Sequence, residues 1–154
     1  MKAFQEVARV LAGGRFVIFT SFPEQTRNFW LREYFPEMIE RSCAQLPGER
    51  IIRDALVAAG LEIEEIVPYD VADDLEDLFL YAGKRRPHLY LDPDVRANIS
   101  SFATQCTVAE LEHGLERLKS DLDSGEIGRV IERYDSREGD YAFVVASVKS
   151  EDRI

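Results

Sequence analysis

The chain has 154 residues, of which 45% are hydrophobic and 31% charged, a composition that suits one folded domain and excludes a mainly disordered chain. Its net charge is −10, and residues 69–154 hold 19 acidic against 11 basic side chains. Because such a surface repels phosphate backbones and anionic lipids, we predict no nucleic-acid partner and no membrane partner. No apolar run approaches the ~20 residues of a membrane-spanning helix, and we expect no signal peptide.

The first 22 residues predict a helix followed by a strand. Residues 1–11 place apolar side chains at the spacing of an amphipathic helix, namely Phe4, Val7, Ala8 and Leu11. Gly13-Gly14 ends this helix, since glycine tolerates the left-handed C-cap conformation. Residues 15–22 then contain a continuous apolar run of four residues. That run is typical of a strand buried on both faces, as in a parallel sheet covered by helices.

Residues 23–68 predict three helical segments and a second strand. The segment 23–46 is helical by pattern, with a second helix opening at Pro36, and residues 49–59 form a short amphipathic helix that ends at Gly60. Residues 61–67 alternate between apolar and polar side chains, which indicates a strand with one wetter face. Pro68 suits the end of that strand.

Residues 72–133 predict a helical insertion that forms a lobe on the same domain, so that 1–154 is a single domain. We expect helices over 73–81, 85–91 and from Asp92-Pro93 onward. Thr107 and Glu110 have the spacing of a capping box. The helix that follows carries an apolar stripe, which consists of Val108, Leu111, Leu115, Leu118 and Leu122. Ser124-Gly125 ends it, a short helical tail covers 126–134, and residues 140–148 predict a third, strongly apolar strand.

The ordered elements resemble the C-terminal half of class I S-adenosylmethionine-dependent methyltransferases, in particular those of the ubiquinone and menaquinone type that act on small molecules. Residues 6–18, EVARVLAGGRFVI, resemble the helix and the L-x-P-G-G turn that lead into the fifth strand of that family's sheet, with Ala12 in the place of the proline. Residues 49–66 resemble the next helix and the sixth strand. Residues 140–148 resemble the seventh, antiparallel strand, and the segment 79–93 resembles a substrate-side insertion.

The resemblance implies an α/β fold with a partial Rossmann-like sheet of three strands, flanking helices and a lid-like helical lobe. In the family, a glycine-rich loop after the first strand and an acidic residue after the second bind S-adenosylmethionine. None of the nine glycines forms a G-x-G motif. We therefore expect no cofactor-binding residues in this chain, and no binding of S-adenosylmethionine by the chain alone.

Candidate site residues are few. Arg85 and Arg86, next to Tyr81 and Tyr90, could bind an anionic substrate, although a solvated helix start is the commoner explanation of such arginines. Trp30 and Tyr34 belong to an aromatic cluster that could line an apolar pocket or simply pack on the sheet. These six residues are our substrate-binding candidates, and their assignment depends mostly on the family resemblance.

No residue is a convincing catalytic or metal-binding candidate. The two histidines, His88 and His113, and the two cysteines, Cys43 and Cys106, have no ligand spacing, so no metal site is predicted. The cysteines are instead typical of reduced thiols in a cytoplasmic protein.

Two functions from different classes fit this sequence. The first is the C-terminal portion of a methyltransferase that acts on a small molecule, inactive by itself because the cofactor half is missing. The second is a non-catalytic interaction or oligomerisation module that descends from such an enzyme. In either case the strand at 15–22 would lack one neighbour, so we predict a homo-oligomer, most simply a two-fold dimer.

Overall fold

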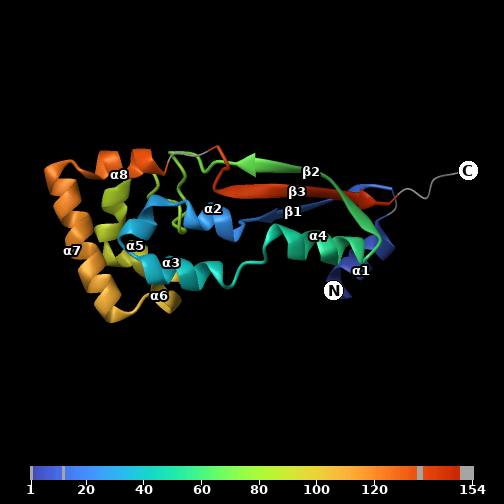
Figure 1. Cartoon of the computed structure of the whole chain (residues 1–154), viewed down its shortest axis with the longest axis horizontal. Coiled ribbons are helices and arrows are strands. Elements are labelled where there is room, and N and C mark those ends of the chain that lie inside the picture. Colours follow the sequence, from blue (N-terminus) through green and yellow to red (C-terminus); the bar gives the residue numbers. More distant parts are fainter. Residues whose placement is uncertain (1, 12, 135–136, 150–154) are drawn as a thin grey trace, which may run out of the picture.

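The computed structural model describes residues 2–11, 13–134 and 137–149, and shows a mixed α/β fold in which a small sheet and a helical lobe lie end to end (Figure 1). Ala12, at the position of the family's proline, lies outside the described residues. The elements in chain order are α1 (Lys2–Val10), β1 (Arg15–Thr20), α2 (Pro23–Arg27), η1 (Trp30–Glu33), α3 (Pro36–Cys43), α4 (Glu49–Val57), β2 (Leu61–Tyr69), η2 (Pro87–Leu91), α5 (Pro93–Ala97), α6 (Ser100–Gln105), α7 (Val108–Ser124), α8 (Ile127–Arg133) and β3 (Tyr141–Val148).

The three strands form one sheet in the order β1-β3-β2. The last strand in the sequence lies in the centre and is antiparallel to both neighbours, so β1 and β2 run in the same direction. Val17 of β1 is opposite Val145 of β3, and Ile66 of β2 is opposite Val144. The three predicted strands are confirmed, and so is the antiparallel direction of the third.

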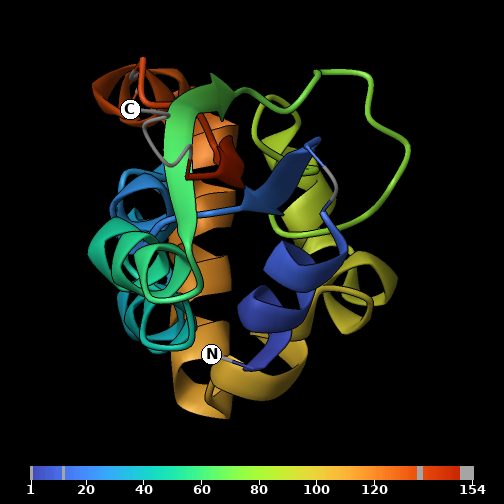
Figure 2. The same ribbon diagram turned by 90° about the vertical axis from the view of Figure 1, so that its right-hand side faces the viewer.

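One face of the sheet is covered by α1 and α4, which lie side by side beneath it (Figures 1 and 2). The buried core on this side consists of Phe22, Ile52, Leu56, Leu61, Ala142, Val144 and Ala146. Phe4 of α1 packs edge-on against Phe16 of β1, with ring centroids 5.9 Å apart. The apolar stripes of the two helices therefore do what their spacing predicts: they remove one face of the sheet from water.

The opposite face of the sheet is open. We define the open face as Val17, Phe19, Val67, Tyr69 and Phe143, which come from all three strands. The first four of these side chains are between 38% and 52% exposed, and the Phe19 ring packs against those of Phe143 and Tyr69. The prediction that residues 15–22 are buried on both faces is therefore wrong. Among the described residues no helix covers this side, and β1 is an edge strand.

The helical lobe has its own hydrophobic core, which draws on residues before and after β2. Phe29, Trp30, Tyr34, Phe35, Met38 and Ile39 pack in one cluster with Tyr81, Tyr90, Ile99, Phe102 and Leu118. The lobe is thus built from α2, η1 and α3 together with the segment 72–133. Gly114 of α7 lets the helix approach closely, because a Cβ there would lie 2.3 Å from the Phe35 ring.

Two predictions within the lobe are wrong. Residues 73–81 contain no helix: the chain after β2 runs as a long loop with isolated turns, which arches away from the sheet before it reaches η2 (Figure 2). Arg86 stabilises this loop by donating to the carbonyl oxygen of Leu75 at 2.6 Å. The predicted apolar stripe of α7 includes Val108, yet this side chain is 73% exposed, because the helix turns its first residue away from the core.

Candidate functional site at the junction of sheet and lobe

The lobe lies against the carboxyl ends of β1 and β2. Thr20 and Tyr69 end these two parallel strands, and Tyr141 begins β3 at the same end. Ligands of α/β proteins bind outside the carboxyl ends of parallel strands, where the loops that follow them diverge. Two hollows lie at this junction, one lined by charged groups and one by hydroxyl groups.

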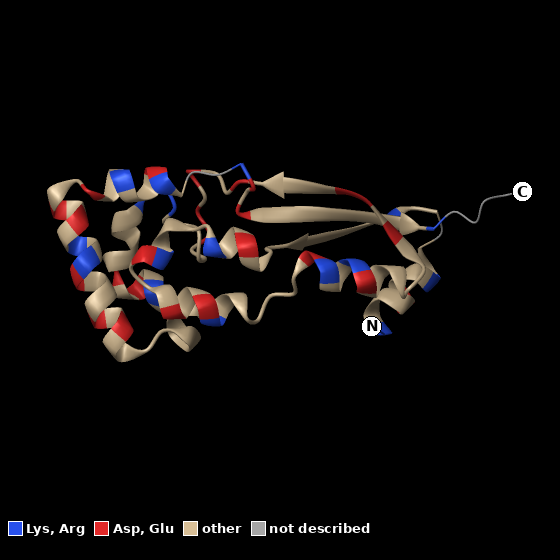
Figure 3. Cartoon of the chain, viewed as in Figure 1, with Lys and Arg blue, Asp and Glu red and all other residues tan. Residues whose placement is uncertain are grey.

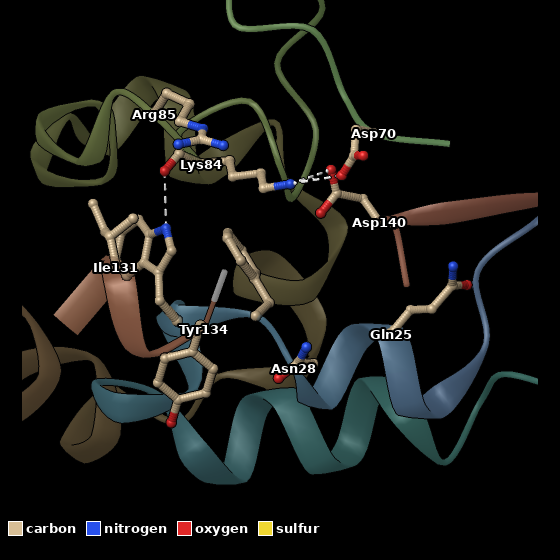
Figure 4. Close-up of a pocket in the computed structure, with 11 residues that line it drawn as sticks. Gln25, Asn28, Asp70, Lys84, Arg85, Ile131, Tyr134 and Asp140 are labelled. Atoms are coloured by element: carbon tan, nitrogen blue, oxygen red, sulfur yellow. Dashed lines mark hydrogen bonds and ion pairs between the residues drawn. The ribbon is translucent and has the colours of Figure 1, made fainter. Parts of the chain in front are cut away.

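The charged hollow is organised by Asp140, the residue before β3 (Figure 4). Its carboxylate accepts a hydrogen bond from the Val71 backbone N–H at 2.8 Å and one from Lys84 Nζ at 2.9 Å. Lys84 also donates to Asp70 at 3.2 Å. The Asp140 side chain is only 8% exposed and that of Lys84 20% exposed, so this ion pair is largely shielded from solvent. It connects the start of β3 to the loop after β2 and to the lobe.

The charged hollow is too small for a substrate. Its cavity volume is about 20 Å³, which is room for about one water molecule. Every strongly buried polar group around it has a partner; the Gln25 side chain, for example, donates to the carbonyl oxygens of Glu138 and Tyr141. The arrangement therefore holds the lobe on the sheet rather than receiving a ligand.

The second hollow, which we call the hydroxyl cleft, has a volume of about 390 Å³. Its walls come from the end of β1, from α2, from α3 and the residues that follow it, from the loop before η2, from α6 and from the start of β3. It is lined by Thr20, Ser21, Thr26, Ser42, Gln45, Leu46, Phe79, Leu80, Tyr81, Ser100, Ser101, Thr104, Gln105 and Tyr141.

Hydrogen bonds hold the inner wall of the hydroxyl cleft in place. The hydroxyl groups of Ser21 and Thr26 lie 3.0 Å apart, Ser21 Oγ donates to the carbonyl oxygen of Asp140 at 3.0 Å, and the Tyr81 hydroxyl donates to Thr26 Oγ1 at 3.3 Å. Burial raises the pKa of Tyr81 to about 12 and raises that of Tyr141 as well. Both phenols therefore stay neutral near pH 7.

Three of the predicted substrate-binding residues are core residues of the lobe. Trp30, Tyr34 and Tyr90 are at most 1% exposed. The Trp30 Nε1–H donates to the Lys84 carbonyl oxygen at 2.9 Å, the Tyr34 hydroxyl donates to Asp121 at 2.7 Å, and the Tyr90 hydroxyl donates to the Leu80 carbonyl oxygen. Burial is the main reason that the pKa values of both tyrosines are raised. Packing and internal hydrogen bonds account for all three, and their role toward a substrate stays a prediction.

The other three candidates have different surroundings. Tyr81 is 2% exposed and lines the hydroxyl cleft. Arg85 is exposed, forms a 3.6 Å ion pair with Asp73 and lines the charged hollow. Arg86 is half-buried, and its guanidinium donates to the backbone carbonyls of Leu75 and Ala82. The two arginines are therefore not brought together into one anion site.

The residues that our sequence reasoning missed are the small hydroxyl side chains of the cleft. Thr20-Ser21 directly follows the apolar run of β1, a position where α/β proteins often place ligand-binding groups, and this is the signal that could have found the site. Ser42, Ser101 and Thr104 come from helices and have no distinguishing spacing. In the described part of the chain no three His, Cys, Asp or Glu side chains gather as metal ligands, and both cysteines are free.

Two of three comparisons with known proteins found nothing: no protein-family model matches the chain, and no curated protein matches it. Among solved structures, it is similar to a protein of Anabaena variabilis ATCC 29413 described as a "putative methyltransferase from antibiotic biosynthesis pathway". The two share 36% sequence identity with a TM-score of 0.76. The match covers 96% of this chain and 60% of the Anabaena chain. The fold thus resembles part of a methyltransferase-like protein.

No helix in the part of the chain that the structure describes is long and apolar enough to span a bilayer. Charged residues are spread along α2, α3, α4, α5, α7 and α8, whereas β1 carries one and α6 and β3 carry none (Figure 3).

Proposed function

We propose that this chain forms the substrate-side portion of an S-adenosylmethionine-dependent methyltransferase that acts on a small molecule, and that the cofactor-binding portion is supplied by other residues. The observation that carries this proposal is the 36% identical match, which takes in almost the whole chain but only 60% of the Anabaena protein. The strand order β1-β3-β2, with an antiparallel central strand, agrees with the last three strands of the Rossmann-like sheet that the sequence resembles.

The two hollows at the junction of sheet and lobe do not fit S-adenosylmethionine. A nucleoside-sized cofactor needs backbone N–H groups that approach it closely and an acidic side chain for its ribose hydroxyls. The charged hollow has carboxylates but only about 20 Å³ of space, and the hydroxyl cleft has space but neither a carboxylate nor a glycine in its lining. We therefore propose that the cofactor binds to the portion of the fold that this chain does not cover.

The outer edge of β1 and the open face are where that portion would dock. The backbone N–H and C=O groups along the outer edge of β1 have no strand neighbour among the described residues, and such an edge favours pairing with a further strand. The exposed Val17 and Phe19 side chains on the same strand would then be removed from water. In the chain alone, we propose that a second copy pairs across this edge and gives a two-fold dimer.

Complementation tests this function. The chain is co-expressed with the part of the Anabaena protein that it does not cover, and the pair is compared with the chain alone for S-adenosylmethionine binding by calorimetry and for methyl transfer from labelled donor. We expect a complex that binds the cofactor, and no binding by the chain alone. Low-micromolar binding by the chain alone would refute the assignment of the cofactor site to other residues.

Light scattering on the chain alone tests the dimer. Phe19→Lys should give a monomer and abolish complex formation, whereas Ile51→Lys, which replaces a 63% exposed residue on α4, should change neither. A dimer that survives Phe19→Lys and never binds the complementing part would instead favour a stand-alone interaction module with another interface.

A further inference from the structure

The hydroxyl cleft differs from three other hollows among the described residues in having no charged lining residue. The charged hollow includes Asp140 and Lys84, a shallow groove beside α4 includes Glu49 and Arg50, and a shallow site on α7 is lined by carboxylates and a lysine. The fourteen residues of the hydroxyl cleft are serine, threonine, tyrosine, glutamine, leucine and phenylalanine only. In a chain with 31% charged residues, this cleft thus offers an ionic ligand no oppositely charged side chain in its lining.

Three aromatic rings, together with Leu46 and Leu80, supply the apolar part of the cleft. Tyr141 packs against Phe79 and Tyr81 with ring centroids 5.8 Å and 5.3 Å apart. Tyr81 is anchored through Thr26, as described above, so its ring is fixed in position. Rings held in this way offer a rigid surface for a flat apolar group.

The lining residues from α3 and α6 carry hydroxyl groups whose hydrogen-bonding capacity is only partly used. Ser42 and Ser101 bond to each other at 3.1 Å, and Thr104 donates to the Ser100 carbonyl oxygen at 2.8 Å. A hydroxyl has one donor and two acceptor positions. These side chains can therefore accept a hydrogen bond from a ligand without giving up the bonds that they make in the fold.

We propose that the hydroxyl cleft binds an uncharged small molecule with an aromatic or other flat ring and at least one hydroxyl or amide group. The ring lies against Phe79 and Tyr141, and the polar group bonds to the hydroxyls of α6. Binding needs this chain only. That the ligand is the methyl acceptor rests on the function proposed above.

The cleft discriminates against charged ligands because it offers no counter-ion. A carboxylate that leaves water without an opposite charge loses hydration that neutral hydroxyls do not replace. The lining has no carboxylate, and its two phenols are protonated near pH 7 because their ordinary pKa of 10 is raised further by burial, so the cleft carries no negative charge that would attract a cation.

The test uses two probes of equal shape and different charge, 4-hydroxybenzamide and 4-hydroxybenzoate. Each is titrated at millimolar concentration into the whole isotope-labelled chain, and backbone amide shifts are followed by NMR. We expect the amide to bind at least about tenfold more tightly than the anion. Its shifts should centre on residues such as Ser21, Tyr81 and Ser101.

Two neighbouring variants on α6 make the test specific. Thr104→Trp fills the cleft and should abolish the shifts, whereas Ala103→Trp adds the same ring at an exposed position that does not line the cleft and should leave them unchanged. Binding of neither probe, equal or tighter binding of 4-hydroxybenzoate, or shifts centred elsewhere would overturn the proposal. Failure of the complementation experiment would leave these binding results intact, so the two proposals fail separately.

Discussion

Replacing Asp140 should separate the lobe from the sheet more effectively than any exposed charge substitution. Asp140→Ala removes the carboxylate that accepts from Val71 N–H at 2.8 Å and from Lys84 Nζ at 2.9 Å. The Val71 N–H would then be buried without a partner, which costs about 1–3 kcal/mol. Breaking a buried ion pair costs about 3–5 kcal/mol in total. The Lys84 side chain is a fifth exposed and keeps its ion pair with Asp70, so we expect the loss in free energy of unfolding to lie at the lower end of this range, about 3 kcal/mol.

The matched control is Asp70→Ala, which removes the other carboxylate that bonds to Lys84. The Asp70 side chain is 65% exposed, so its loss should cost at most about 1 kcal/mol. Asp140→Asn keeps an acceptor for Val71 N–H and should fall between the two. Urea unfolding near neutral pH measures all three free energies of unfolding. If Asp140→Ala costs no more than Asp70→Ala, the inference that Asp140 holds the junction together is wrong.

Three further predictions concern the lobe and its core. Gly114→Ala should lower the free energy of unfolding by about 1–3 kcal/mol, because the new Cβ would lie 2.3 Å from an aromatic ring. Gly128→Ala is the control: its Cβ meets open space, so the free energy of unfolding, measured in urea, should rise by up to about 1 kcal/mol. Leu118→Ala should lower the free energy of unfolding by about 2–5 kcal/mol because the side chain is fully buried, whereas Val108→Ala, at a 73% exposed position, should lower it by less than about 0.5 kcal/mol. If urea unfolding gives the same loss for both variants, the buried and exposed faces of α7 are wrongly assigned. The pKa of Tyr81 is raised by burial to about 12 from its ordinary value of 10, so the stability that it contributes is complete below pH 10 and is lost as the pH rises toward 12. The urea midpoint of unfolding should therefore fall between pH 10 and pH 12, and it should fall less steeply with pH in Tyr81→Phe. An equal dependence on pH in the two proteins would show that Tyr81 does not carry this effect.

The predicted elements that the structure confirms are those marked by signals within a few residues of the element, such as a cap or a glycine stop. Thr107 caps α7 by accepting from the Glu110 N–H at 3.2 Å, and Gly125 ends it with φ +79°. The order of helices and strands that supports the family resemblance also follows from such local signals. A cap, a glycine stop or an apolar period acts within a few residues, so the sequence alone is enough to place it.

The sequence could not predict the structure where side chains can either serve a local helix or contact distant residues, because the tertiary structure selects between these partners. Glu110 has the spacing to complete a capping box, yet its carboxylate accepts from the Met38 N–H of α3 at 2.8 Å and pairs with Arg41 instead. Residues 73–81 have helical periodicity, yet Leu75 and Leu78 pack against the lobe core from a loop. In both cases contacts with residues distant in the sequence outweigh a local preference of about 1 kcal/mol or less.

What the sequence by itself determined about this protein is the three strands, most of the helices, their order, and the lack of a G-x-G motif. Only the tertiary structure decided that one face of β1 is open and that hydroxyl groups from Thr20 to Tyr141 gather in one uncharged cleft. The physical reason is that a strand's periodicity shows two faces but not which one a helix will cover. A cleft, in turn, is the space left where separate segments fail to fill the volume between them, and no single segment encodes it.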